Sequence, residues 1–192
     1  MTVPEGEENA REGLFSFLSR RRFLKASLVV GGALLGVAGG SLFILRGRAP
    51  NVDGLQALDA HEYQTLKSLV EIMFPRTDAI PIDVESMDLP RAFDEFLTGE
   101  PKHNVQDLKK ALVLIEFGPL VFDRQVSTFS RLDPEARLAH WKSWAISDNL
   151  LRRQVSVAMR KFFNLVFFDH EAVWPFIGYP GPSLLRSRSV KQ

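Results

Sequence analysis

The segment LDAHEYQTLKSLVEIMFP, residues 58–75, shows what kind of structure this chain is built from. Asp59 precedes the pattern and Glu62 follows three positions later, which is the spacing of a capping box at a helix start. From Tyr63 onward, apolar residues recur every three or four positions until Pro75 ends the run. The segment therefore predicts an amphipathic helix that buries one face.

Shorter helical patterns follow in the middle of the chain. Residues 75–88 form a loop rich in proline and acidic residues, and the next pattern predicts a short helix over about 89–98 that Gly99 closes. Asn104 is expected to cap a third helix, which Gly118-Pro119 then interrupts. A further helical piece is expected to run through three apolar residues: Phe122, Val126 and Phe129.

Two more helices are expected in the C-terminal half. Asp133 followed by a proline is a strong helix start, and Trp141 and Trp144 line the helix that it opens. Asp148 is expected to open the last long helix, about 149–168. With no alternating strand pattern and no internal repeat, these segments predict an all-α fold: a small bundle of about five or six helices, preceded by an N-terminal signal or anchor helix.

The composition excludes several classes of function. Of the 192 residues, 45% are apolar and 24% are charged, and the formal net charge is only +1, so a nucleic-acid partner is not expected. The chain has no cysteine. This excludes disulfides, zinc sites with cysteine ligands, iron–sulfur clusters, covalently attached c-type haem and thiol catalysis.

A basic motif directly precedes the longest apolar segment of the chain. The motif is SRRRFLK, residues 19–25, and residues 26–45 then carry no charge. A basic region before an apolar segment is the layout of an export signal, and this motif resembles the twin-arginine (Tat) signal. The alternative is a basic flank that orients an ordinary membrane helix. The residues expected to be recognised by the Tat translocase are Ser19, Arg20, Arg21, Phe23, Leu24 and Lys25, with Arg22 at the variable position.

The sequence leaves the fate of this signal open. The nearest cleavage pattern is Gly47-Arg48-Ala49, and Pro50 after it disfavours cleavage. The apolar segment has about twenty residues, which is enough for a helix to cross a bilayer. We therefore divide the chain into a Tat signal or signal anchor, a linker, a helical domain and a basic tail. The boundaries are 1–48, 49–57, 58–183 and 184–192.

No pattern in the chain indicates a catalytic, cofactor-binding or metal site. The four histidines have no helical ligand spacing between them and are interpreted as surface or partly buried polar residues: His61, His103, His140 and His170. The sequence Asp169-His170-Glu171 places three possible ligands next to each other, where they cannot easily face one ion. Basic side chains recur along the last long helix and are interpreted as its solvated face: Arg152, Arg153, Arg160 and Lys161.

An aromatic segment rich in turn-forming residues ends the predicted domain. Rigid rings of this kind are typical of interface anchors. The alternative is a segment that folds back over the core. As a partner interface we predict Trp174, Phe176, Tyr179, Pro180 and Pro182.

Three stretches, taken together with the Tat motif, resemble one protein family. They are LDAHEYQTLKSLVEIMFP (58–75), FSRLDPEARLAHWKSW (129–144) and FFDHEAVWPFIGYPGP (167–182). The chain is similar, over roughly residues 15–183, to the subunit 3 family of gluconate 2-dehydrogenase.

The resemblance implies a role as an accessory subunit that is not itself an enzyme. Members carry no prosthetic group and assemble with a large flavoprotein of the glucose–methanol–choline type, which binds FAD and oxidises a sugar or sugar acid. A multihaem cytochrome c commonly completes the complex. The small subunit's Tat signal carries the folded complex across, which implies a location on the periplasmic side of the bacterial inner membrane. A membrane-anchored assembly factor and a stand-alone periplasmic enzyme are the alternatives.

Overall fold

Helices make up the regular structure, and the predicted all-α fold class is confirmed. The computed structural model describes residues 47–48, 51–74, 78, 81–82 and 87–181. Over these residues it contains seven α-helices, one 3-10 helix and no strand. In chain order they are α4 (Ala60–Met73), α5 (Leu89–Thr98), α6 (Lys102–Glu116), α7 (Gly118–Asp123), the 3-10 helix η2 (Phe129–Arg131), α8 (Pro134–Ala145), α9 (Leu150–Asp169) and α10 (Trp174–Ile177).

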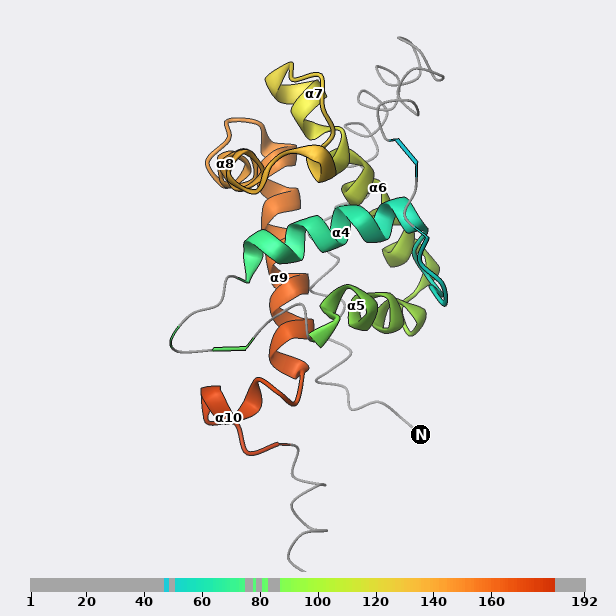
Figure 1. The fold of residues 1–192 in the computed structure, drawn as a ribbon, viewed down its shortest axis with the longest axis vertical. Helices are drawn as coiled ribbons and strands as arrows, with labels where there is room; N and C mark the ends of the chain where they lie inside the picture. Colours follow the sequence, from blue (N-terminus) through green and yellow to red (C-terminus); the bar gives the residue numbers. More distant parts are fainter. Residues whose placement is uncertain (1–46, 49–50, 75–77, 79–80, 83–86, 182–192) are drawn as a thin grey trace, which may run out of the picture.

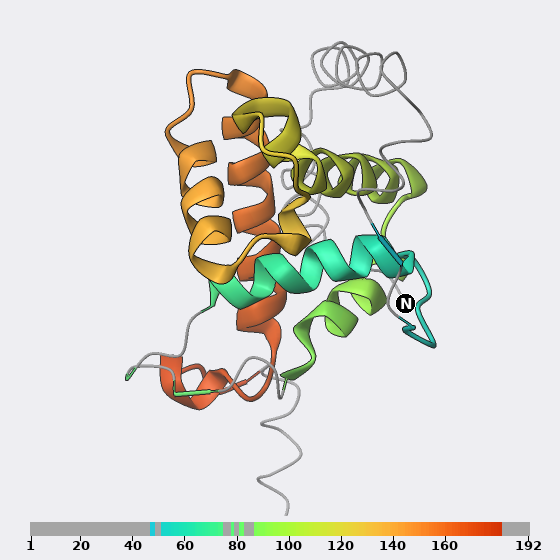
Figure 2. The same cartoon turned by 45° about the horizontal axis from the view of Figure 1, so that its top comes forward.

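The longest helix, α9, organises the domain. It runs the length of the bundle with α8 alongside it, and α4 crosses it (Figures 1 and 2). On its other side α4 packs against α5 and α6. The short helices α7 and α10 lie at opposite ends of the domain (Figures 1 and 2).

The predicted helix starts at Asp59 and Asp133 are confirmed. Asp59 accepts a hydrogen bond from the backbone N–H of Glu62, and the Glu62 carboxylate accepts one from the backbone N–H of Asp59, both at 2.8 Å. Asp133 likewise accepts from the backbone N–H of Ala136 at 2.9 Å. These bonds satisfy N–H groups that have no partner within the helix.

Phenylalanine rings form the centre of the core. Phe93 of α5 lies 4.8 Å, between ring centroids, from both Phe162 and Phe163 of α9, and all three are at most 2% exposed. Burying one such ring contributes about 1.5–3 kcal/mol. The side of α9 that faces the core carries seven buried apolar side chains: Leu151, Val155, Met159, Phe162, Phe163, Val166 and Phe167.

Three expectations about helix ends were wrong. Asn104 does not cap the third helix, because α6 begins at Lys102 and the buried Asn104 side chain donates to Glu100 at 3.1 Å. The last long helix is capped by Asn149, one residue after the predicted Asp148. No single helix runs through Phe122, Val126 and Phe129, because α7 ends at Asp123 and Val126 is 81% exposed.

Among the helices of the described part, none combines the length and the apolar character needed to cross a membrane. The predicted signal or anchor segment, residues 26–45, lies outside the described residues.

Candidate functional site

The sequence predicts two recognition segments, the Tat motif and the C-terminal aromatic segment, and the structure describes only the second. The Tat motif, residues 19–25, lies outside the described residues, as does Pro182. The C-terminal aromatic segment is described up to Gly181.

The C-terminal aromatic segment is a single helical turn held against the end of α9. Trp174 Nε1 donates to the backbone carbonyl of Phe168 at 3.1 Å, and its ring meets Tyr179 edge-on with 5.3 Å between centroids. Gly178 ends the turn in the left-handed region at φ +68°, which glycine adopts without strain. Val173, which is 0% exposed, joins the turn to the core.

Most rings of this segment face outward. Phe176 is 47% exposed and Tyr179 is 45% exposed, whereas Trp174 is half-buried. Pro180 is also exposed. We call the exposed apolar side chains at this end of the domain the C-terminal apolar surface: Leu165, Phe168, Phe176, Ile177 and Tyr179. Their role as a partner interface stays a prediction.

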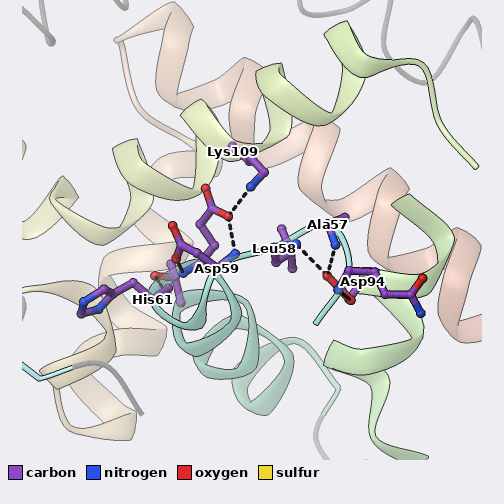
Figure 3. A network of polar contacts seen from close by, with 9 residues as sticks. Ala57, Leu58, Asp59, His61, Asp94 and Lys109 are labelled. Atoms are coloured by element: carbon purple, nitrogen blue, oxygen red, sulfur yellow. Dashed lines mark hydrogen bonds and ion pairs between the residues drawn. The ribbon is translucent and has the colours of Figure 1, made fainter. Parts of the chain in front are cut away.

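A buried carboxylate fixes the chain just before α4 (Figure 3). Asp94 of α5, only 1% exposed, accepts hydrogen bonds from the backbone N–H groups of Gln56, Ala57 and Leu58 at 2.6, 2.9 and 2.7 Å. These bonds satisfy the buried charge. The end of the predicted linker, 49–57, is therefore fastened to the domain.

A second carboxylate joins this region to α6. Glu62 accepts from Lys109 Nζ at 2.8 Å through the same oxygen that accepts from the backbone N–H of Asp59 (Figure 3). His61, drawn beside them, is half-buried. These groups satisfy one another, so we interpret them as structural.

The prediction that all four histidines are surface or partly buried residues was wrong for His140. His140 is only 5% exposed, because it faces inward from α8 toward α7 and α9. Its Nδ1 lies 2.5 Å from a carboxylate oxygen of Asp123, and its Nε2 accepts from the indole Nε1–H of Trp144 at 3.0 Å. We call this group, together with Gly118 and Arg152, the His140 cluster.

Arg152 also lies elsewhere than predicted. Its guanidinium stands over the rings of Phe122 at 4.9 Å and Trp144 at 5.5 Å, and its side chain is 12% exposed. It donates to Ser143 Oγ at 2.5 Å and lies 4.0 Å from Asp123. Arg160 and Lys161 are exposed, as a solvated face requires.

The electrostatics keep His140 neutral. Burial lowers the pKa of His140 and outweighs the raising effect of Asp123, while the Arg152 charge lowers it further. Since an indole can only donate, Nε2 carries the lone pair and Nδ1 carries the proton. With both ring nitrogens engaged inside the protein, the ring has no free nitrogen to act as a base or as a metal ligand in this conformation.

No metal site is formed by the side chains that the structure describes, because no three His, Asp or Glu groups lie together with suitable geometry. His170 caps the end of α9, and its Nδ1 accepts from the backbone N–H of Ala172 at 3.2 Å. Asp169 and Glu171 are exposed on either side of it.

Comparison of the chain with protein-family models, with curated proteins and with solved structures finds no match.

Proposed function

We propose that this chain is the non-catalytic small subunit of a periplasmic, FAD-dependent sugar or sugar-acid dehydrogenase complex. Its catalytic partner would be a glucose–methanol–choline-type flavoprotein that holds the FAD, and a multihaem cytochrome c is a further expected partner. The chain would supply Tat export, stabilisation of the catalytic subunit and attachment to the inner membrane.

The observation that carries the proposal is the twin-arginine motif at residues 19–25, placed directly before the charge-free residues 26–45. The Tat route moves folded proteins, and cofactor insertion in the cytoplasm is a common reason for using it. A helical subunit without its own prosthetic group would then export a cofactor-loaded partner. The C-terminal apolar surface is compatible with such a partner, because exposed aromatic rings on a rigid support suit a protein interface.

The export role is tested by changing the two matching arginines, Arg20 and Arg21, to lysine. We expect both the chain and its flavoprotein partner to accumulate in the cytoplasm, because the translocase reads the arginine pair. Arg22→Lys, at the variable position, is the matched control and should leave export unchanged. Normal arrival of the flavoprotein in the periplasm of the double variant would refute the carrier role.

The subunit role is tested by a mild detergent pull-down of the tagged chain from membranes, read by mass spectrometry and by a flavin spectrum. A stoichiometric FAD-containing partner supports a stable subunit. A partner bound only transiently during maturation would indicate an assembly factor instead. Flavin that stays with this chain alone would indicate a stand-alone enzyme.

A further inference from the structure

The outer half of α7 is held in place through the His140 cluster. Within α7 only Gly118 and Pro119, at its start, are buried. Its other end contacts α8 and α9 through two side chains. Phe122 meets the Trp144 ring edge-on at 5.6 Å between centroids, and Asp123 accepts from His140 Nδ1 at 2.5 Å.

Within the cluster, the hydrogen bond from Trp144 to His140 depends on an uncharged ring, and the covering start of α7 keeps water from Nε2. Protonation would place a hydrogen on Nε2, where the Trp144 N–H already points, at a nitrogen–nitrogen distance of 3.0 Å. Two donors would then face each other in a buried site, where an unsatisfied polar group costs about 1–3 kcal/mol.

The packing leaves little room to relieve this conflict locally. Trp144 is 0% exposed. The start of α7 lies so close that a Cβ added to Gly118 would be 2.9 Å from His140 Nε2 and 2.8 Å from Trp144 Cζ2. Water can therefore reach Nε2 only if α7 moves away from α8.

Charged groups from both neighbouring helices face the ring. Asp123 of α7 favours the protonated ring, and Arg152 of α9 disfavours it. From η2 the ring receives the uncharged Phe129, at 5.9 Å between centroids. Burial is the largest influence and lowers the pKa of His140 below its ordinary value of 6.5.

We propose that the His140 cluster is a pH-sensitive latch, which holds α7 against α8 and α9 while His140 is neutral and releases α7 when His140 is protonated. Release exposes the apolar faces of Phe122 and Trp144 to solvent or to a binding partner. The latch does not depend on the proposed subunit role, since it follows from contacts within this chain.

The test is hydrogen exchange of the full-length chain in detergent solution, measured by mass spectrometry between about pH 7.5 and about pH 4.5 and corrected for intrinsic exchange rates. In the wild type, protection of the α7 amides should fall by up to tenfold for each pH unit below 6.5, until the native pKa is reached. The amides of α9 should keep their protection.

His140→Gln is the decisive variant. A glutamine amide can accept from the Trp144 N–H and donate to Asp123, but it does not titrate in this range. Protection of α7 should then be independent of pH. The same pH dependence in His140→Gln would overturn the latch, as would a wild type whose α7 stays protected throughout or loses protection in equal measure with α9.

Two further variants test the sign and keep the proposal falsifiable if His140→Gln folds poorly. Asp123→Asn removes the charge that favours protonation and so lowers the native pKa, which means that the loss of α7 protection should continue to lower pH before it levels off. Arg152→Gln removes the charge that opposes protonation and so raises the native pKa, which means that the loss of α7 protection should level off at higher pH. Shifts in the opposite directions, or none in either variant, would overturn the proposal.

Discussion

The indole N–H of Trp144 donates to Nε2 of His140, one helical turn earlier in α8, over 3.0 Å. This contact fixes the tautomer of the histidine, because a donor-only partner requires a lone pair on Nε2. The proton of the neutral ring is thereby directed to Nδ1, where Asp123 accepts it. Trp144 thus fixes which nitrogen of the neutral His140 ring carries the proton.

Replacing Trp144 with phenylalanine should raise the pKa of His140 above its wild-type value, because a protonated Nε2 would no longer face another donor. The loss of the hydrogen bond should also lower the free energy of unfolding by about 1–3 kcal/mol. An NMR titration of the His140 ring and urea denaturation measure the two effects. Trp141→Phe is the control: Trp141 donates to Met73 Sδ at 3.0 Å, so its loss should leave the His140 titration unchanged.

The lowered pKa of His140 also makes the stability of the whole domain depend on pH. The unfolded chain binds a proton at a pKa near 6.5, whereas the native ring binds it only at lower pH. Stability should therefore be fully present above pH 6.5 and be lost as the pH falls from there to the native pKa.

For this single group the slope is at most about 1.4 kcal/mol per pH unit. Urea denaturation at several pH values measures it, and His140→Gln should reduce it. His103→Gln, at an exposed position, is the matched control. An equal reduction in both variants would show that His140 is not the source.

Gly118→Ala should destabilise the domain, because the added Cβ would meet the rings of Trp144 and His140 at 2.8 and 2.9 Å. Both rings are buried and cannot swing away, so the expected loss is about 1–3 kcal/mol. Gly99→Ala is the control, since its Cβ would meet only a backbone oxygen at 3.6 Å, an ordinary contact. Thermal unfolding compares the two, and equal effects would contradict the close packing at Gly118.

Asp94→Asn should loosen the chain before α4. The amide keeps one acceptor oxygen but loses the charge that three backbone N–H groups share. We expect a loss of about 1.5–3 kcal/mol, in the range of hydrogen bonds to charged groups, and faster exchange at the amides of residues 56–58. Glu95→Gln, at the exposed neighbouring position, should change neither measurement.

Local signals explain which parts of this fold were predictable. The capping box of Asp59 and Glu62 and the start at Asp133 act within one helical turn, so the sequence contains both partners at a fixed spacing. The periodic apolar face of α9 is likewise a local pattern, and seven of its apolar side chains are buried. The all-α class follows from signals of this kind.

The contacts that the sequence did not reveal join residues far apart in the chain. Asp94 holds Leu58, 36 positions earlier, and His140 meets Asp123, 17 positions earlier. Neither acidic residue differs by local pattern from a solvated one. The sequence did contain one indication for His140. Trp144 follows it by four positions, so the two side chains share one face of a helix. Their burial, however, depends on α7 packing over them, which the local pattern does not show.

Phe176→Asp should separate the binding role of the C-terminal apolar surface from its structural role. Since Phe176 is 47% exposed, the free energy of unfolding should change by less than about 0.5 kcal/mol. Val173→Asp, at a fully buried position three residues earlier in the chain, should instead cost several kcal/mol, because it places an unpaired charge in an apolar site. If the proposed subunit role holds, Phe176→Asp should also greatly reduce the flavoprotein recovered with the tagged chain, because a charge in the apolar centre of an interface opposes association.

Val126→Asp, at an 81% exposed apolar position at the other end of the domain, is the binding control and should recover as much partner as the wild type. Equal recovery with Phe176→Asp would show that the partner binds elsewhere, while the absence of a flavoprotein with the wild type would refute the subunit role itself.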